Sequence, residues 1–422
     1  MQLAERHIIK SNNAFYKELD AISFLSKNLY NRANYIVRQE FINTTKDKEA
    51  GRRDKANWLR YNSIQKQLQN DKDLDYCALP AKVSQHVLRL LDKNWTSFFK
   101  SIREWKKNPI KYKGQPKLPR YKHKTGGRNV LTYTVQAISK KELNKGIIAL
   151  SGTIIKINTK QIPDDIQQVR VVPRIGHYVI EVIYNKKEVK NENLDKNKIA
   201  GGDLGLNNLL AITSNQKVEP LLINGRPIKS MNQYYNKKKA KLQSYVGDKS
   251  SNRLTTLTNK RNRKIDDYLH KASRLVVDYL SENNFGVFII GKNNQWKTEI
   301  NMGRRNNQAF VNIPHARFIE MIKYKCELVG IEVVITEESY TSKCSFIDKE
   351  EMKHHDKYLG RRRHRGLFIS KDGVKLNADC NGSGNIIRKA IPTAFDGYGI
   401  EGVVVHPLRI NPKGYYSYKQ VA

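Results

Sequence analysis

The sequence predicts an α+β protein of several domains: a small β-barrel domain with an inserted helical module, followed by an α/β domain. Its 422 residues, 39% of them apolar, are enough for two or three domains with real cores. The hydrophobic pattern changes from helical spacing to strand alternation, and then to a mixture of both. A charged, apolar-poor stretch, NKKEVKNENLDKNK (185–198), separates the two halves, and we place the linker at 191–198.

The N-terminal half begins with a strand at about residues 4–10, within a first segment 1–14. Helical spacing then governs 15–107, where apolar residues recur every three or four positions, as in Ile22, Leu25, Leu29, Ala33 and Ile36. The polar segment TTKDKEAGRRDK predicts a loop within this module. Strand signals over 108–190 predict the β-barrel, and the first strand is expected to pair there, which makes the helical module an insertion.

The charge of the chain is extreme, because 77 Lys and Arg face 40 Asp and Glu, for a net charge of +37. Such a surplus indicates a polyanionic partner, since neutralised phosphates release counterions. Residues 100–128 concentrate it, with eleven basic residues, one acid and interleaved aromatics, although a basic linker would read the same way. The candidate nucleic-acid contacts in this basic strap are Lys106, Lys107, Lys111, Lys113, Lys117, Arg120, Tyr121, Lys122 and Lys124.

The C-terminal half, 199–422, alternates strands and helices. Strands are predicted at 199–204, 209–213 and 221–224, then a long basic helical region at about 230–281. A buried strand at 285–290, a helix at 314–329, a strand at 331–336 and a final helix after Asp379 follow. Three hairpin strands followed by helix–strand–helix–strand–helix is the order of an RNase H-like domain.

Two carboxylates in this half fit RNase H-like chemistry, in which two Mg²⁺ ions lie between acidic side chains. Asp203 ends a central strand in IAGGDLGLNNLLAITS, and we expect Gly201, Gly202 and Gly205 to let a phosphate backbone approach. Asp379 stands at the start of the last helix in LNADCNGSGNIIRKA. Asp203 alone could be a stray acid of a hairpin, and Asp379 alone could be a helix cap.

Three ordered motifs, GGDLGLNNLLAIT, YTSKCS (340–345) and NADCNGSGNIIRK, resemble TnpB, the RNA-guided nuclease of bacterial insertion sequences and a relative of type V CRISPR effectors. LYNRANYIVRQEF and GQPKLPRYKHK in the N-terminal half are similar in style. The resemblance implies a RuvC-type nuclease domain, a guide RNA, a double-stranded DNA target beside a short motif, and Mg²⁺. It makes Asp203 the first catalytic carboxylate and Asp379 the third.

One departure from the family concerns the second carboxylate. The family usually has a Glu at the end of the buried strand, but FGVFIIGKNN has Gly291 there. Glu337 and Glu338, at the end of the next strand, could replace it, as in a subset of the family that this pattern resembles. Period-2 alternation aims the two at opposite faces, so one of them is expected to reach the metals. The alternative is a nuclease-inactive, repressor-like RNA-guided DNA binder.

A second departure concerns the zinc ribbon that the family usually carries. Segment 343–375 has Cys344, His354, His355 and His364 but no CxxC pair, and Cys380 directly follows Asp379. Structural zinc prefers four ligands in tight pairs, so we expect a metal-free hairpin here. Its basic residues Arg361, Arg362, Arg363 and Arg365 are expected near nucleic acid, unless they form a solvated loop.

Weaker candidates are Trp296, Lys297 and Asp348, together with the basic run Lys237, Lys238, Lys239 and Lys241, for which a solvated helix face is an equal alternative. The four scattered cysteines suit a reducing compartment, and no apolar run reaches the roughly 20 residues of a membrane span. We therefore expect a cytoplasmic, nucleoid-associated monomer with no membrane partner. Nothing in the sequence demands a transposase that joins DNA ends itself.

Overall fold

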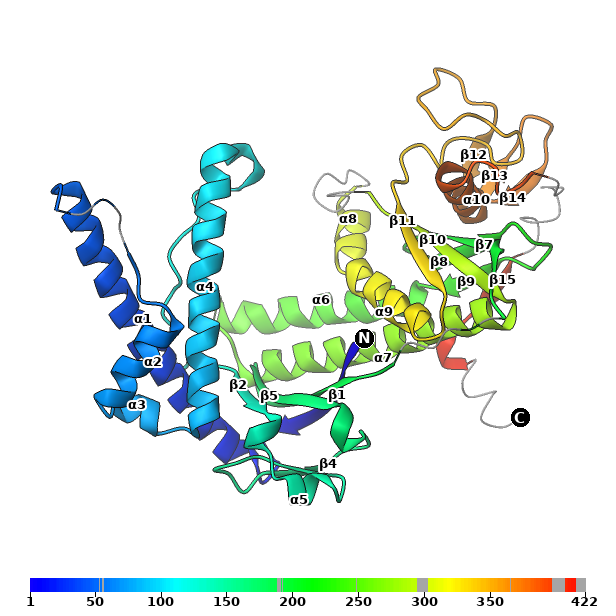
Figure 1. The fold of residues 1–422 in the computed structure, drawn as a ribbon. Helices are drawn as coiled ribbons and strands as arrows, with labels where there is room; N and C mark the ends of the chain where they lie inside the picture. The colour runs from blue at the N-terminus through cyan, green and yellow to red at the C-terminus, as the bar shows by residue number, and fades with distance from the viewer. Residues whose placement is uncertain are drawn as a thin grey trace. The chain divides into compact units, whose positions relative to one another are not determined.

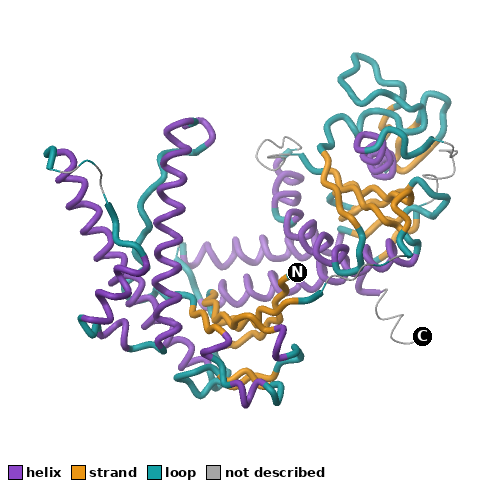
Figure 2. Tube along the Cα trace, in the orientation of Figure 1, coloured by secondary structure: helices purple, strands orange, loops and turns teal. Residues whose placement is uncertain are grey.

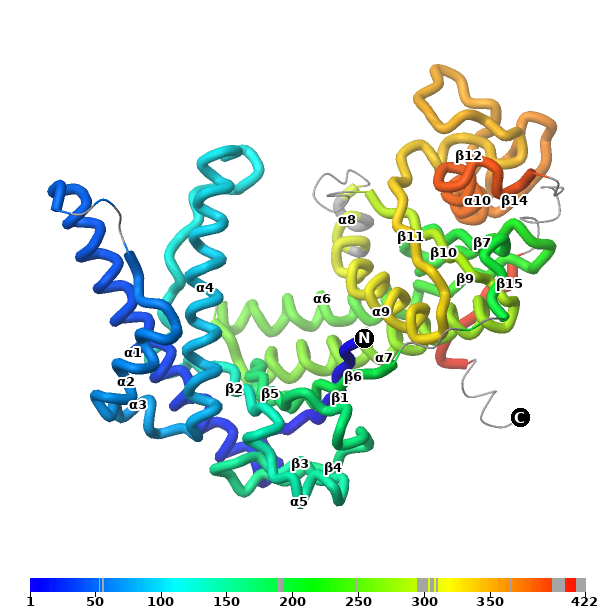
Figure 3. Tube along the Cα trace, in the orientation of Figure 1, coloured from blue at the N-terminus to red at the C-terminus, as the bar shows by residue number. Residues whose placement is uncertain are grey.

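The computed structural model describes residues 1–52, 54, 57–187, 191, 193–247, 249–293, 303–364, 366–396 and 407–414. It divides into two compact units, Met1–Lys186 and Lys187–Ala422. Figures 1 and 3 trace the chain through both, and Figure 2 separates helices from strands. Within the described residues, no helix is both long and apolar enough to cross a bilayer.

Unit 1 inserts its first four helices between its first two strands. Its helices are α1 (Tyr16–Glu49), α2 (Tyr61–Asn70), α3 (Leu74–Cys77), α4 (Ala81–Lys107) and the short α5 (Lys140–Leu143), with 3-10 turns η1 (Pro109–Lys111), η2 (Val135–Ala137) and η3 (Pro163–Asp165). The helical module is centred on Trp95, which is fully buried and donates its Nε1 proton to Asn34 Oδ1 at 3.0 Å. Helix α1 runs through the start of the predicted loop TTKDKEAGRRDK, because nothing there breaks a helix before Gly51.

The main sheet of unit 1 is antiparallel, with strand order β1-β6-β5-β2. Its strands are β1 (Gln2–Lys10), β2 (Leu131–Thr134), β5 (Ile166–Arg174) and β6 (His177–Asn185), beside a separate pair, β3 (Ile147–Ala149) and β4 (Lys156–Asn158). The first strand pairs with β6, as predicted. The β-barrel is not confirmed, because among the described residues the four strands form an open sheet.

Unit 2 is built on a mixed six-stranded sheet of order β11-β10-β7-β8-β9-β15. Strands β7, β8 and β9 form an antiparallel meander, whereas β10 and β11 add in parallel beside β7. The strands are β7 (Asp195–Leu204), β8 (Asn208–Ser214), β9 (Leu221–Asn224), β10 (Phe285–Gly291), β11 (Glu332–Thr336) and β15 (Leu408–Ile410). Residues 195–198, predicted as linker, belong to β7.

Helices cover both faces of this sheet. Helices α6 (Arg226–Val246), α7 (Asn252–Glu282), α8 (Arg304–Val311) and α9 (His315–Glu327) precede β11, and α10 (Ala378–Ala390) follows the small sheet β12 (Arg361–His364), β13 (Leu367–Ile369) and β14 (Lys375–Asn377). One core joins the sheet to α7 and α9 through Phe288, and the other joins it to α10 through Ile289. These neighbouring residues of β10 point to opposite faces, as strand alternation requires.

A cluster of carboxylates at one edge of the sheet

Three acidic side chains from three elements meet at one edge of the unit 2 sheet. Asp203 is the next-to-last residue of β7, Glu338 follows the end of β11 by two residues, and Asp379 is the second residue of α10. Because β7, β10 and β11 are parallel, their carboxyl ends lie at the same edge. Burial raises the pKa of Asp203 well above its usual range, and the nearby charges of Glu338 and Asp379 raise it further.

Helix α10 packs closely enough on β7 to cover Asp203, because glycines clear the way. A methyl group on Gly382 would lie 2.7 Å from Asp203 Oδ2, and one on Gly201 would lie 2.7 Å from the Ser383 carbonyl oxygen. Gly202 faces Phe288 of the core instead, and a methyl group on Gly205 would meet the Asn208 carbonyl oxygen at 2.6 Å. The expectation that these glycines admit a phosphate is therefore wrong: they admit protein atoms.

Gly291 makes room for the Glu338 carboxylate. Ile290 pairs with Gly202 and Gly291 with Thr336, so Gly291 lies in the row that joins the end of β7 to the end of β11. A methyl group there would lie 2.8 Å from Glu338 Oε2 and 2.5 Å from Ile386 Cδ1. The position that lacks the expected carboxylate is thus occupied by a carboxylate from the neighbouring strand.

The chain holds the backbone of Glu338 in place. Its N–H donates to Asn293 Oδ1 at 2.9 Å, and its carbonyl accepts the Thr341 hydroxyl at 2.8 Å. Glu338 Oε2 is buried and has no hydrogen-bond partner among the described residues. Burial is the main cause that raises the pKa of Glu338 to about 7, and the neighbouring Glu337 adds to it. A carboxylate held in this way is suited to a cation rather than to a protein donor.

Glu337 lies outside the cluster. Its side chain is 53% exposed, it forms an ion pair with Lys389, and it accepts the Ser339 N–H at 2.9 Å. The expectation that only one of the two glutamates reaches the cluster therefore agrees with the geometry, which selects Glu338.

Asp379 does not cap its helix. Asn377 is the N-cap, and its side chain accepts the N–H groups of Asp379 and Cys380. The Asp379 carboxylate is left to face the cluster, where it accepts Asn208 Nδ2 at 2.7 Å and Arg362 Nη2 at 3.3 Å. The helix-cap alternative is therefore wrong for Asp379.

The donor set is one that a hard cation prefers, since the three carboxylates offer only oxygen atoms. Asn208 adds to it a buried Oδ1 that has no partner among the described residues. As they stand, no three or more His, Cys, Asp or Glu side chains in the described part of the chain are grouped tightly enough to hold a metal. The positive charge of Arg362 offsets only part of the rise in the pKa of Asp203.

The segment predicted to lack zinc is organised by hydrogen bonds. Glu350 is 4% exposed, and its carboxylate accepts Ser345 N–H at 2.7 Å and Leu359 N–H at 2.8 Å. The buried Cys344 thiol donates to the Glu351 carbonyl at 3.3 Å. Asn381 of α10 bonds both the Phe346 N–H and the Cys344 carbonyl, each at 2.9 Å. The absence of zinc from this segment stays a prediction.

Residues 119–124 of the basic strap lie along one face of α1, whereas residues 100–107 are the last part of α4. Side chains of α1 spaced by three or four residues donate to backbone carbonyls of the strap: Lys27 to Lys124, Asn31 to Lys122, and both Asn34 and Arg38 to Pro119. Lys111 is exposed but paired with Glu104, and Lys122 is half-buried over Tyr30. The other exposed candidates are Lys106, Lys107, Lys113, Lys117, Arg120, Tyr121 and Lys124. Their role stays a prediction.

The remaining candidates are spread over unit 2. Arg361 and Arg363 are exposed on β12 beside Arg362, and Lys237, Lys238, Lys239 and Lys241 lie on α6. Asp348 accepts the Lys371 N–H at 2.9 Å, a bond between segments 23 residues apart in sequence. Trp296, Lys297 and Arg365 lie outside the described residues.

The sequence did not single out Asn208, Asn293 and Gly382. These residues contact or position the three carboxylates but are not acidic themselves. Asn208 and Asn293 stand inside quoted motifs, but an Asn in a turn is too common to single out. Only the fold shows that Gly382 faces Asp203.

Two family models match the C-terminal part of the chain. A family described as probable transposase, OrfB_IS605, matches residues 180–297, and the TNB domain of Cas12f1-like proteins matches residues 315–386. These matches agree with the TnpB-like family that the motifs resemble. The two matched regions contain all three carboxylates of the cluster. No curated protein matches the chain.

Solved structures resemble the chain distantly. A Cas12f1–sgRNA–target DNA complex has 16% identity and a TM-score of 0.36, covering 91% of this chain and 98% of the other. A CRISPR-Cas12f ternary complex has 15% identity and a TM-score of 0.35, covering 87% and 81%. C2c1 of Alicyclobacillus acidoterrestris with single-guide RNA has 8% identity and a TM-score of 0.40, covering 89% and 70%. These scores are low, and the similarity to known families rests on the two family models.

Proposed function

We propose that the chain is an RNA-guided DNA endonuclease that cleaves target DNA by metal-dependent hydrolysis in a RuvC-like site. The single observation that carries the proposal is the position of the Glu338 carboxylate. It lies beside Gly291, in the row of residues that leads to Asp203 at the end of β7. It supplies a second acid at the place where this chain has Gly291 instead of the glutamate of the family pattern. The strand order β9-β8-β7-β10-β11 supports an RNase H-like domain.

In this proposal Asp203, Glu338 and Asp379 hold Mg²⁺, with Asn208 orienting Asp379. When bound, a pair of Mg²⁺ ions supplies an activated water and a charge that stabilises the leaving oxygen. The raised pKa values of Asp203 and Glu338 fit this role, because burial opposes ionisation of both carboxyl groups and a bound cation would favour their ionised forms. The Arg362 side chain is 43% exposed. In this proposal it exchanges its ion pair with Asp379 for one with a phosphate while it stays in contact with water.

The net charge of +37 and the exposed cations of the strap support a guide RNA and double-stranded DNA as partners. Base pairing would read the target sequence, while the protein reads duplex shape, backbone and a short adjacent motif. One nuclease site would cut both strands in turn, with the protein working as a monomer.

The rival function is a nuclease-inactive, RNA-guided DNA binder, which Gly291 suggests and the position of Glu338 disfavours. RNA that copurifies with the chain would be sequenced to define the guide, and a matching plasmid carrying a randomised flanking sequence would be incubated with Mg²⁺. We expect cutting by the native chain, and binding without cutting by Asp203→Asn. Guide-dependent binding with no cutting by the native chain would establish the rival. Strand-transfer products would instead indicate a transposase.

A further inference from the structure

Helices α6 and α7 form a hairpin whose outer half is not part of the core. The buried side chains of α6 are Ile228 and Asn232, near its start, and burial in α7 begins only at Ile265. Between these points the two helices run side by side without a fully buried side chain among the described residues (Figure 1). The outer half, 233–264, is therefore available to a partner.

The base of this hairpin is held by polar contacts. Arg261 Nε donates to Asn232 Oδ1 at 2.9 Å, and its Nη2 donates to the Asn312 carbonyl at 3.0 Å. The Tyr235 and Thr258 hydroxyls lie 3.1 Å apart in a further bond between the two helices. These contacts hold the base of the outer half in place, which lowers the entropic cost of binding a ligand there.

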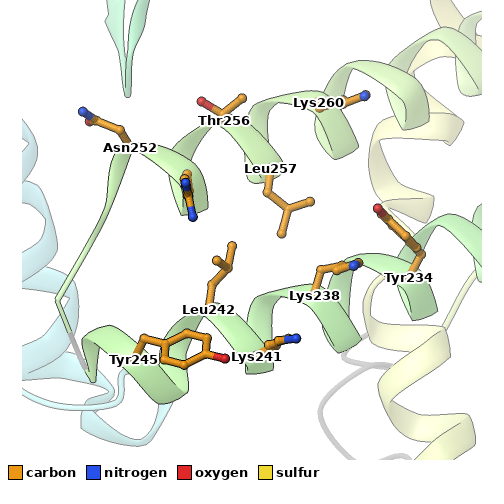
Figure 4. Close-up of a pocket in the computed structure, with 10 residues that line it drawn as sticks. Tyr234, Lys238, Lys241, Leu242, Tyr245, Asn252, Thr256, Leu257 and Lys260 are labelled. Carbon is orange, nitrogen blue, oxygen red and sulfur yellow. The ribbon is translucent and has the colours of Figure 1, made fainter.

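A cavity of about 810 Å³ lies between the two outer helices. This is within the roughly 300–1,000 Å³ range of small-ligand pockets. Leu242 and Leu257 point toward each other across it, and Tyr234 and Tyr245 border it (Figure 4). The two tyrosines are 61% and 74% exposed, and the Lys238 ammonium lies over the Tyr234 ring, 5.9 Å from its centroid. Its lining comprises Tyr234, Lys238, Lys241, Leu242, Tyr245, Asn252, Arg253, Thr256, Leu257 and Lys260.

The charge around this cavity has a single sign. Four exposed cations line it, Lys238, Lys241, Arg253 and Lys260, and no acid does. Within the described ranges, none of the four has a recorded ion pair. Residues 226–264 contain twelve Lys and Arg against one acid, whereas 265–282 contain four acids against two. The excess of positive charge therefore belongs to the outer hairpin and favours an anionic ligand.

We propose that this cavity binds an unstacked nucleotide of a single-stranded nucleic acid, its base against Tyr245 or Tyr234 and its phosphates on the surrounding cations. Aromatic rings interleaved with cations are the features that single strands require. A duplex presents backbone and groove edges instead, and would leave the tyrosine faces and the two leucines without a partner. The inference deepens the proposed function and rests on it for the presence of a guide RNA, but not on cleavage.

The test measures binding by the full chain in EDTA, which separates it from cleavage. A single-stranded RNA oligonucleotide carrying one 2-aminopurine, the same sequence in DNA, and a blunt duplex are the probes. We expect quenching of 2-aminopurine on binding, and roughly tenfold weaker single-strand affinity in Tyr245→Ala, with less loss in Tyr245→Phe. Comparison of the RNA and DNA arms identifies which strand the pocket prefers.

Lys237 provides a matched control, because it is exposed on the same helix but does not line the cavity. Lys238→Ala should weaken binding more than Lys237→Ala. Photocrosslinking of 4-thiouridine RNA should place the adduct within 234–257. Equal affinities for the native chain, Tyr234→Ala and Tyr245→Ala, or equal losses for duplex and single strand, would overturn the proposal. Asp203→Asn should bind as the native chain does, so loss of cleavage and loss of this pocket are separable.

Discussion

Two glutamates twelve residues apart, Glu338 and Glu350, occupy opposite environments in the same unit. The Glu350 carboxylate accepts two backbone N–H groups, from Ser345 and Leu359, and closes the loop between them. Glu338 Oε2 is buried with no partner in the described part of the chain, and burial raises the pKa of Glu338 to about 7.

The difference teaches how to read the two departures from the family pattern. Where the zinc ribbon lacks its cysteines, Glu350 satisfies backbone donors and makes a structural loop. Where the second catalytic acid is missing, Glu338 enters the space beside Gly291 and is left unsatisfied. A fully bonded carboxylate stabilises the fold, whereas an unsatisfied one is held ready for a ligand.

The largest expected effect is on the rate of cleavage, and it comes from a substitution at Glu338. Glu338→Gln should lower the rate of guide-directed DNA cleavage at least about a hundredfold, because a metal-binding carboxylate contributes several kcal/mol to the transition state. Single-turnover cleavage of a matched target, with guide-dependent binding measured in parallel, checks it.

The matched control for this change is Glu337→Gln, since Glu337 is exposed and paired with Lys389. Its rate should stay within about threefold of the native rate, as for loss of a surface ion pair. If Glu337→Gln abolishes cleavage and Glu338→Gln does not, the assignment of the second carboxylate is wrong.

A smaller effect is expected from filling the space beside Glu338. Gly291→Ala places a methyl group 2.8 Å from Glu338 Oε2, so the carboxylate or Ile386 must move. We expect roughly a tenfold loss of cleavage rate, because small displacements of reacting groups are costly. In the double variant with Glu338→Gln, the methyl group should add almost nothing. Fully multiplicative losses would show that Gly291 acts independently of Glu338.

A substitution at Glu350, the second glutamate of the comparison, should lower the stability of the fold. Glu350→Ala leaves the N–H groups of Ser345 and Leu359 without their acceptor, and should lower the free energy of unfolding by roughly 1–3 kcal/mol. Denaturant unfolding measures this. At a temperature where the variant stays folded, cleavage should fall much less than in Glu338→Gln. If Glu350→Ala unfolds at the same denaturant concentration as the native chain, the Glu350 carboxylate does not stabilise this loop.

Much of this geometry could be predicted from the sequence, because periodicity and strand order are local signals. The strands that carry Asp203 and Gly291 and the helix of Asp379 lie where the pattern placed them. Alternation also predicted that only one of Glu337 and Glu338 would reach the cluster. It could not say which, since the turn after β11 sets that choice through Asn293 and Thr341. The Asn377 cap is a local contact with the N–H groups two and three residues further on. The role of the glycines as packing sites for α10 depends on contacts far apart in sequence.

The smallest expected effect is on the pH dependence of stability without metal. The folded-state pKa of Glu338, about 7, lies above its ordinary value of 4.5, so the folded protein retains this proton longer than the unfolded chain. Its contribution to stability is therefore fully present below about pH 4.5 and is lost as the pH rises toward 7. In EDTA, the Tm of the native chain should fall relative to that of Glu338→Gln across this interval. Mg²⁺ should reverse the difference near pH 7, because a bound cation favours the ionised carboxylate. A Tm difference that stays flat with pH, with or without Mg²⁺, would mean that the Glu338 carboxylate is neither desolvated nor bound to a cation, and the contrast with Glu350 would then be one of position only.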